Sequence, residues 1–433
     1  MGRGGGRRPS LSAMTDRLRD DCFALPQGVD WTPVDEALRL LREGMRCVTG
    51  AQEVALAEGA GRVLAEPVIA RRSNPPAANS AIDGFAFAWA SLAGAAEGDL
   101  ALAEGRSAAG HPYPGAVAPG AAVRILTGAE IPAGTDTVVL QEDSEVVGDR
   151  VHFHAPRKQG ANTRKAGEDA EAGAEVLPDG RRLTPADLAR AAAVGADRLV
   201  VRRRLRLGIL STGDELMQPG ADPALPGVFD ANRPMLAALA RSQGFEVADL
   251  GAVADEPERV RAALDRGADE ADAIVTTGGA SAGEEDHVSR ILTQEGRITT
   301  WRIAVKPGRP LALGFWRGVP VFGLPGNPVA AFVCFVIFAR PALSVMAGAG
   351  WREAQGFMVP AGFEKTKKPG RREYLRARMR ADGHVEVFHS EGSGLIGGLS
   401  WAEGLVELPD GAVTIQPGDP VRYLPYSSFG LMP

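Results

Sequence analysis

The spacing of hydrophobic and polar positions changes along the chain, and one long region shows a regular alternation of two patterns. Between residues 205 and 348, short apolar runs alternate with segments of helical period. The predicted strands are 205–210, 246–251, 272–277, 299–305 and 319–326, and the predicted helices are 232–244, 256–267, 286–296 and an apolar segment from 328. Strands that alternate with helices of this length predict βαβ units. We therefore expect a doubly wound α/β domain with a parallel sheet.

The regions on either side have other patterns. Residues 32–44 have helical period, with Thr32 as the expected N-cap and Pro33 in the first turn. Residues 85–157 contain short β-like runs between Gly and Pro, which predict a small antiparallel β domain. Residues 184–195 begin with Thr-Pro and end with Gly, as a capped helix does. The last 80 or so residues return to short strands and Gly turns, so a second small β domain is expected there.

Composition excludes several classes of protein. The chain has 433 residues, enough for roughly three domains, and its net charge of −6 leaves no basic surface for nucleic acid. The three cysteines form no zinc-binding spacing and suit a reducing cytoplasm, so any thiophilic metal must take its sulfur ligands from a substrate. The N-terminal segment is basic and then mixed in charge, and it lacks the apolar core that a signal peptide needs, so we do not expect it to act as one. The longest apolar run, 328–339, stops at Arg340 and predicts a buried helix, not a membrane span.

Charged residues and glycines follow the predicted strands of the α/β region. Ligands of doubly wound sheets bind beyond the carboxyl ends of the strands, where these loops are expected to meet. Carboxylates there suit a divalent cation, and lysine and arginine suit an oxyanion. The five loops are "STGDEL" with Thr212, Gly213 and Glu215; "FDANRP" with Asp230; "GGASAGEED" with Gly278, Gly279 and Asp286; "KPGRP" with Lys306, Arg309 and Pro310; and "LPGNP". A single acid in such a loop is more often a helix cap, but charges in four of five loops favour a binding site.

The third of these loops also matches G-x-S-x-G, the nucleophile elbow of serine hydrolases, at Ser281. Three acids, Glu284, Glu285 and Asp286, follow directly. Their negative charge would oppose an oxyanion, which a hydrolase must stabilise. We expect Ser281 to donate a hydrogen bond to a ligand or to cap a helix, with a serine hydrolase as the weaker alternative. His152 and His154 share one face of a strand without a third ligand nearby, so an exposed strand face is favoured over a metal site.

At this point the set of motifs resembles a known family. "LGILSTGDEL", "FDANRPML", "TTGGASAGEEDHV", "AVKPGRP" and "GLPGNPVA", in this order, resemble the molybdopterin molybdenumtransferase family, which includes MoeA and is related to gephyrin. The N-terminal segments "NSAIDGFA", "VRILTGAEIPAGTDTVVLQED" and "NTRKAGEDAEAG" resemble the same family. The resemblance extends over about residues 32–425, which is nearly the whole chain.

The resemblance implies a fold and an activity. The expected fold is a molybdopterin-binding-type α/β domain flanked by an N-terminal region with an inserted β domain and by a C-terminal β barrel. The implied boundaries are a disordered tail at 1–29, an N-terminal domain at 30–70 and 158–204, the inserted β domain at 71–157, the α/β domain at 205–348 and the barrel at 349–433. The family inserts molybdate into adenylylated molybdopterin with release of AMP and requires Mg²⁺. It works as a homodimer, and the composition adds the expectation of a cytoplasmic protein without nucleic-acid or membrane partners.

The resemblance also implies roles for individual residues. Motif by motif, the catalytic residues would be Asp83, Thr127, Asp169, Glu215 and Asp286. Substrate and molybdate would be bound by Arg164, Thr212, Gly213, Asp230, Gly278, Gly279, Ser281, Lys306, Arg309, Pro310, Arg376 and Ser393. The metal ligands would be Glu215, Asp230 and Asp286. By the same resemblance, Asp83 would act with the α/β domain of the other subunit of the dimer.

Two positions depart from the family pattern, and two further functions compete with it. Arg309 stands where the family has lysine, which keeps the charge but changes its geometry. His287 stands where the family has tyrosine. A molybdopterin adenylyltransferase shares the α/β domain, but it lacks the flanking β domains and the Asp83 loop. A scaffold protein of the gephyrin kind needs a long linker or a partner domain, which the motif set does not include.

Overall fold

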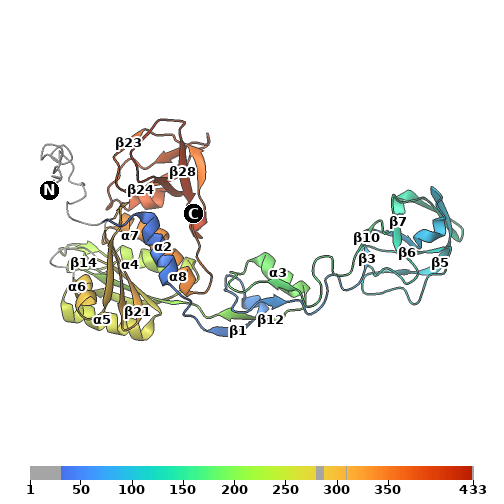
Figure 1. The fold of residues 1–433 in the computed structure, drawn as a ribbon, viewed down its shortest axis with the longest axis horizontal. Helices are drawn as coiled ribbons and strands as arrows, with labels where there is room; N and C mark the ends of the chain where they lie inside the picture. The colour runs from blue at the N-terminus through green and yellow to red at the C-terminus, as the bar shows by residue number, and fades with distance from the viewer. Residues whose placement is uncertain (1–30, 279–286, 309, 432–433) are drawn as a thin grey trace, which may run out of the picture. The chain divides into compact units, whose positions relative to one another are not determined.

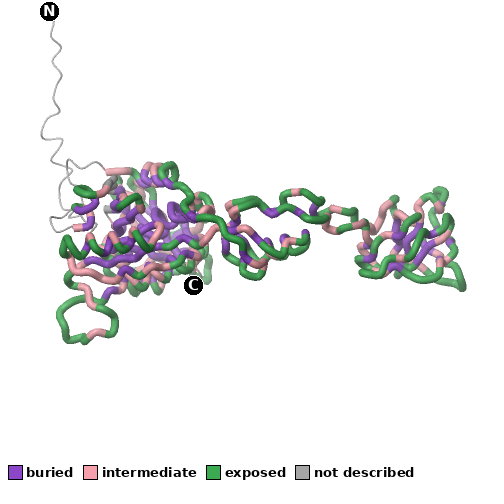
Figure 2. Tube along the Cα trace, turned by 90° about the horizontal axis from the view of Figure 1, so that it is seen from below, coloured by how far each residue is buried: buried purple, intermediate pink, exposed green. Residues whose placement is uncertain are grey.

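The computed structural model describes residues 31–278, 287–308 and 310–431 (Figure 1). The chain separates into two compact units. Unit 1 consists of the segments up to Thr49 and from Arg204 onward, and unit 2 consists of Gly50–Arg203. The buried positions run through the interior of unit 1, whereas exposed positions cover its outside (Figure 2).

Unit 1 contains the α/β domain that the sequence predicts. Its six-stranded sheet has the order β16-β13-β17-β21-β20-β18, and β16, β13, β17 and β21 run parallel. These strands are β13 (Arg206–Thr212), β16 (Glu246–Val253), β17 (Ala273–Thr277), β18 (Arg297–Arg302), β20 (Pro310–Trp316) and β21 (Val319–Leu324). The helices between them are α4 (Asn232–Ser242), α5 (Pro257–Glu270) and α6 (His287–Gln294). A short pair, β14 (Leu216–Met217) and β15 (Val228–Phe229), lies beyond β13.

The prediction of a wholly parallel sheet was wrong at one edge. Strand β20, which the periodicity did not indicate, runs antiparallel to both β18 and β21. Only Arg317 and Gly318 connect β20 to β21, and both have positive φ, +49° and +87°. Two consecutive residues of positive φ form the tight turn of a β-hairpin, which enforces an antiparallel pair.

The helix that follows β21 is longer than predicted. It begins as α7 (Pro328–Cys334), passes through a π-helical segment, Phe335–Ala339, and ends as α8 (Arg340–Met346). The helix continues through Arg340, because the buried guanidinium finds partners: it donates to the carbonyls of Val336 and Arg352. Burial lowers the pKa of Arg340 to about 10. The 19-residue helix is apolar enough to cross a membrane, but 94% of its apolar window is buried inside the protein, as expected of a core helix.

Helix α2 (Val34–Gly44) packs against α8 with Val34, Ala37 and Leu41 buried. Its N-cap is Pro33 and not Thr32, since Thr32 forms a β-bridge with Ile303 and accepts a backbone bond from Ala304. The β-bridge between Thr32 and Ile303 therefore replaces the capping role that the local pattern predicted for Thr32.

The C-terminal part of unit 1 is a second sheet. Its order is β19-β24-β26-β28-β22, and β25 also pairs with β24. The predicted strand 299–305 is divided between the two sheets: β18 ends at Arg302, and β19 (Val305–Lys306) pairs with β24. The other elements are β22 (Phe357–Pro360), β23 (Lys365–Lys367), β24 (Arg372–Met379), β25 (Val385–Val387), α9 (Gly397–Trp401), β26 (Gly404–Leu408), β27 (Val413–Ile415), β28 (Pro420–Pro425) and a final 3₁₀ turn, η5 (Tyr426–Phe429).

Unit 2 contains a six-stranded sheet of order β7-β4-β6-β5-β9-β8. The expected purely antiparallel arrangement was wrong for one pair, because β5 and β6 are parallel. These strands are β4 (Gly84–Phe87), β5 (Glu97–Ser107), β6 (Ala121–Ile125), β7 (Thr137–Leu140), β8 (Ser144–Val147) and β9 (Arg150–His154), with 3₁₀ turns η2 (Trp89–Leu92) and η3 (Gln141–Asp143). His152 and His154 lie toward the exposed side of β9, as predicted.

The rest of unit 2 is built from three two-stranded pairs and one helix. Thr184 caps α3 (Pro185–Ala193), and Asp187 bonds back to Thr184, so the predicted capped helix is confirmed. The strand pairs join segments far apart in the sequence: β1 (Ala51–Ala55) with β12 (Arg198–Arg202), β2 (Val68–Ile69) with β11 (Glu175–Leu177), and β3 (Asn79–Ser80) with β10 (Thr163–Arg164), while a 3₁₀ turn, η1 (Leu56–Glu58), follows β1.

Candidate active site

The loops after the parallel strands of unit 1 surround a cavity of about 540 Å³, which we name the strand-end pocket. Four residues singled out from the sequence line it: Thr212, Glu215, Asp230 and Gly278. Residues after β21 and from the 394–396 segment complete the wall. The expectation that several strand-end loops meet at one edge is therefore met for four of the five loops.

Buried polar atoms without partners characterise this pocket. Ser211 Oγ, Thr212 Oγ1 and Asn232 Oδ1 are buried, and none has a hydrogen-bond partner within the described ranges. Asn232 is held in place by its amide nitrogen, which donates to Thr277 Oγ1 (2.7 Å) and to the Gly326 carbonyl (2.6 Å). Buried polar groups in proteins are normally hydrogen-bonded, and exceptions call for an explanation such as a ligand. The pocket is therefore prepared to bind a polar molecule.

Gly278 closes the floor of the strand-end pocket. Its φ is +84°, and a Cβ at this position would lie 2.2 Å from the Thr212 carbonyl oxygen. Only glycine allows β17 to turn away this close to the end of β13. This geometry gives a physical reason for the first glycine of the sequence "TTGG", Gly278.

The two predicted acids of this pocket differ in their surroundings. Asp230 is buried, accepts from the Arg233 backbone N–H (3.1 Å) and is paired with Arg233 Nε at 3.0 Å. Its carboxylate thus anchors the first turn of α4. Glu215 is exposed at the pocket wall, and no ion-pair partner for it occurs among the described residues. Of the two, Glu215 is the carboxylate that is available to a ligand.

Lys306 lies in a second cavity, of about 220 Å³, which we name the lysine pocket. Sequence reasoning placed Lys306 beside the other strand ends, but β19 carries it into the C-terminal sheet. There Lys306 Nζ lies 2.6 Å from Glu391 and 3.5 Å from Glu373. Lys365 contacts the same two acids, Glu373 at 3.3 Å and Glu391 through a short bond. Two lysines and two glutamates therefore form one closed network.

Sequence reasoning missed three members of this network, Lys365, Glu373 and Glu391. They come from β23, from β24 and from the loop after β25. Burial raises the pKa of Glu391, but the bonds from Lys306 and Lys365 outweigh it and hold the pKa below the ordinary value. Burial likewise lowers the pKa of Lys365, and the two acids more than compensate. No local motif links these residues, so no signal in the sequence identified them.

Arg376, predicted as an oxyanion contact, lines the lysine pocket and also organises a loop beside it. Its guanidinium is buried and donates to the carbonyls of Leu395 (2.7 Å), Gly392 (3.2 Å) and Ser390. It also lies over the Phe388 ring, 4.8 Å from the centroid. The carbonyl of Ser393 in this loop accepts from the Val329 N–H, which ties the loop to α7. The 390–396 loop borders both pockets: Glu391 lines one, and Ile396 lines the other.

The predicted residues of unit 2 lie on three connected loops. Asp83 Oδ1 accepts from both the N–H and the hydroxyl of Thr127, each at 2.7 Å, and these bonds hold the pKa of Asp83 below its ordinary value. The 79–83 loop is bonded to the 126–130 loop and to Asn162. Arg164 is exposed on β10, and Asp169 accepts from the Asn74 side chain at 3.0 Å. Asp83 and Thr127 thus form a direct pair, with Arg164 and Asp169 on the returning segment.

Several predicted residues lie outside what the structure describes. These are Gly279, Ser281, Asp286 and Arg309. Pro310 is described only as the first residue of β20. The roles assigned to these four residues therefore remain predictions. Within the described ranges, no cluster of three His, Cys, Asp or Glu residues has the arrangement of a metal site.

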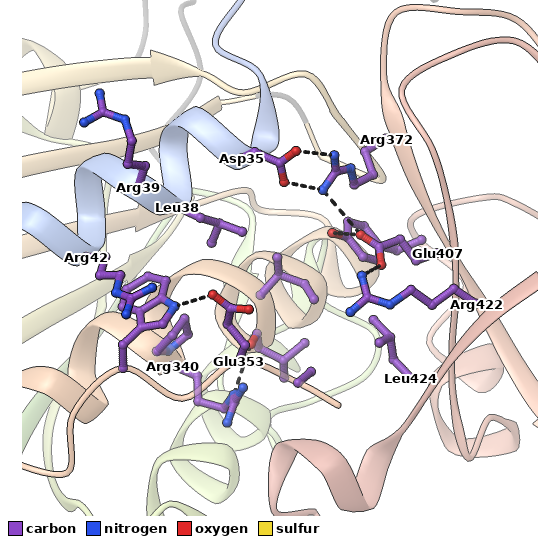
Figure 3. A pocket seen from close by; sticks show the side chains of 16 residues that line it. Asp35, Leu38, Arg39, Arg42, Arg340, Glu353, Arg372, Glu407, Arg422 and Leu424 are labelled. Carbon is purple, nitrogen blue, oxygen red and sulfur yellow. Dashed lines mark hydrogen bonds and ion pairs between the residues drawn. The ribbon is translucent and has the colours of Figure 1, made fainter. Parts of the chain in front are cut away.

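A third cavity, shown in Figure 3, lies between α2, the core helix and the C-terminal sheet. Arg372 pairs with both oxygens of Asp35, at 2.7 and 2.9 Å, and Arg422 pairs with Glu407 at 2.5 Å. The Asp35–Arg372 pair joins α2 to the sheet across 337 positions of sequence, and the Arg422–Glu407 pair connects two strands of the sheet itself. We interpret this cavity as part of the packing of unit 1.

Comparison with known proteins covers nearly the whole chain. Residues 32–195 match the MoeA N-terminal region (domain I and II), residues 208–345 match a probable molybdopterin binding domain, and residues 358–426 match the MoeA C-terminal region (domain IV). The molybdopterin molybdenumtransferase of Haemophilus influenzae is 34% identical over 82% of this chain and 88% of its own. Molybdopterin molybdenumtransferase 2 of Mycobacterium tuberculosis is 34% identical over 89% and 97%.

Solved structures agree with these matches. The molybdopterin biosynthesis MoeA protein of Pyrococcus horikoshii OT3 has a TM-score of 0.81 and 27% identity, over 92% of this chain and 100% of that one. The multidomain fold with an α/β domain and flanking β domains is thereby confirmed. The chain belongs to the molybdopterin molybdenumtransferase family, and it is an enzyme of the transferase class.

Proposed function

We propose that the protein inserts molybdate into adenylylated molybdopterin and releases AMP, which yields the molybdenum cofactor. The main support for this proposal is that the strand-end pocket and the lysine pocket border the same loop, 390–396. The strand-end pocket offers buried hydroxyl and amide groups without partners among the described residues, and the lysine pocket beside it offers two ammonium groups. A polar pterin nucleotide suits the first, and a tetrahedral oxyanion suits the second.

The residues of the two pockets have different tasks in this reaction. Thr212 and Asn232 bind and orient the pterin nucleotide through their unpartnered atoms, and Gly278 leaves room for it. Lys306 binds molybdate, and Arg376 shapes the loop between the pockets. The dithiolene of the substrate supplies the sulfur ligands, so the three cysteines of the chain are not needed for the metal.

The donor set fits Mg²⁺ in part. Mg²⁺ is usually held by one or two carboxylates together with substrate phosphates. Glu215 meets this requirement, and by family resemblance Asp286 would be the second acid. Asp230 fits less well, because Arg233 already neutralises its carboxylate. When bound, the ion would neutralise charge on the pyrophosphate of the substrate.

The proposal includes a cytoplasmic homodimer without membrane or nucleic-acid partners. The resemblance to the family suggests the dimer, and the acidic composition and the burial of the apolar core helix agree with the absence of such partners. Sedimentation equilibrium should give the mass of two chains, and a monomer at micromolar concentration would contradict the dimer.

The decisive experiment supplies purified protein with adenylylated molybdopterin, molybdate and Mg²⁺ and follows AMP. AMP should appear only when molybdate is present, and Glu215→Gln should slow its release by about 100-fold or more, as expected on removal of one electrostatic group of an active site. The matched control is Glu256→Gln, whose carboxylate is exposed and paired with Arg259. Consumption of ATP with molybdopterin, in place of AMP release, would favour the adenylyltransferase.

A further inference from the structure

Glu391 occupies the position between the two ammonium groups of the lysine pocket. One carboxylate oxygen accepts from Lys306 at 2.6 Å, and the other accepts from Lys365. Both lysine side chains are largely enclosed, with exposed fractions of 26% and 12%. A single carboxylate therefore bridges two cations with its two oxygens, as two oxygens of a tetrahedral oxyanion would do.

The two acids of the network differ in their freedom to move. Glu373 projects from β24 in the C-terminal sheet, and its side chain is 10% exposed. Glu391 lies on a loop, and its side chain is 46% exposed. Glu391 can turn into water at small cost, whereas Glu373 is enclosed. Glu373 therefore stays in the network, whereas Glu391 can leave it and a ligand can take its place.

The net charge of the lysine pocket changes when Glu391 leaves it. With Glu391 in place, the two lysines and two glutamates of the network sum to zero, and so do Arg376 and Glu364, which also line the pocket, so no net charge attracts an anion. With Glu391 turned outward, Lys306, Lys365 and Glu373 sum to +1. An incoming dianion and Glu391 compete for the same two ammonium groups, because like charges at this separation repel.

We propose that Glu391 is an internal competitor for the oxyanion substrate and that Lys365 is a second ligand of that oxyanion besides Lys306. This inference rests on the proposed function, since the oxyanion is the molybdate of that reaction. Glu391 and Lys365 therefore set the concentration at which molybdate is used, while Glu391 keeps the lysines in position when the pocket holds no substrate.

The test measures binding of molybdate alone to the full-length protein by isothermal titration calorimetry. Glu391→Gln should bind molybdate between about 3-fold and 10-fold more tightly than the wild type, the range expected when one partly exposed ion pair no longer competes. Glu391→Asp should stay near the wild type. The matched control is Glu386→Gln, whose carboxylate pairs with Arg378 at 2.6 Å outside the pocket; its affinity should not change.

The role of Lys365 needs a double-mutant cycle. Lys365→Met should weaken binding of molybdate. It should do so also in the Glu391→Gln background, where the Glu391 carboxylate that Lys365 otherwise binds is absent. Equal affinities of Glu391→Gln and Glu391→Gln/Lys365→Met would show that Lys365 only positions Glu391 and would overturn its role as a ligand. Thermal unfolding of each variant and the charge-keeping Lys365→Arg separate a binding loss from a folding loss.

Failure of this inference differs from failure of the proposed function. If the wild type releases AMP with molybdate but Glu391→Gln binds molybdate no more tightly, the competitor role is wrong and the proposed function stands. If the wild type releases no AMP but the affinities follow the predicted order, the oxyanion pocket stands and the reaction is a different one.

Discussion

The strand-end pocket and the lysine pocket border the same loop, but they leave their polar groups in opposite states. In the strand-end pocket, Thr212 and Asn232 have buried atoms without partners among the described residues. In the lysine pocket, Lys306 and Lys365 are paired with acids of the chain itself. A ligand completes the hydrogen bonds of the first pocket, whereas it must displace an existing ion pair in the second.

This difference has an energetic consequence. A buried polar atom without a partner costs the folded protein about 1–3 kcal/mol, which a ligand can recover on binding. A partly exposed ion pair contributes only about 0–1 kcal/mol, so replacing it changes the stability little but changes the selectivity for charge. We infer that the strand-end pocket provides affinity for the organic substrate and that the lysine pocket discriminates among anions.

The largest expected effect concerns the backbone of the strand-end pocket. Gly278→Ala should lower the free energy of unfolding by about 2–5 kcal/mol, because it adds strain at positive φ to a clash with the Thr212 carbonyl. The matched control is Gly251→Ala, at φ +83° with open space around it, which should cost about 1 kcal/mol. Urea unfolding measures both, and equal losses would show that the contact with Thr212 does not constrain the pocket.

A smaller effect tests whether the unpartnered atoms are there for a ligand. Thr212→Val should leave the free energy of unfolding unchanged or raise it by up to about 1 kcal/mol, since it removes an unsatisfied hydroxyl, and should weaken substrate binding by about 10-fold. Thr276→Val is the control, because Thr276 Oγ1 is also buried without a partner among the described residues but does not line the pocket. Chemical denaturation and substrate titration are the measurements. A clear loss of stability in Thr212→Val would mean that the hydroxyl already has a partner.

The smallest effect concerns the pH dependence of the lysine pocket. The folded protein holds the pKa of Glu391 below its ordinary value, so the stability that this carboxylate contributes is present above the unfolded pKa and is lost as the pH falls through the folded one. Wild type and Glu391→Gln should therefore differ at neutral pH, by less than about 1 kcal/mol because the side chain is half exposed, and converge in acid. Unfolding curves from pH 7 downward test this, and a difference that persists below the folded pKa would exclude the ion pair as its cause.

Much of the fold was predictable from local patterns. The alternation of apolar runs and helical segments between 205 and 348 predicted the α/β domain, and Thr184 before Pro185 predicted the start of α3. Where the prediction failed, a contact with a distant segment had replaced a local preference. Thr32 pairs with Ile303 and so does not cap α2, and Arg340 finds carbonyl partners within the core and so does not end the helix.

The sequence by itself determined the strand-end loops, because the end of a parallel strand and the glycines and acids after it are properties of short segments. Only the tertiary structure decided the lysine pocket. The register of β19 against β24 places Lys306 opposite Glu373, and the loop after β25 brings in Glu391, which is 85 positions from Lys306. It also decided which acids are available: Asp230 and Glu215 look alike in the sequence, but Arg233 neutralises the first. Periodicity and capping act over a few residues, whereas ion pairing depends on which strands become neighbours.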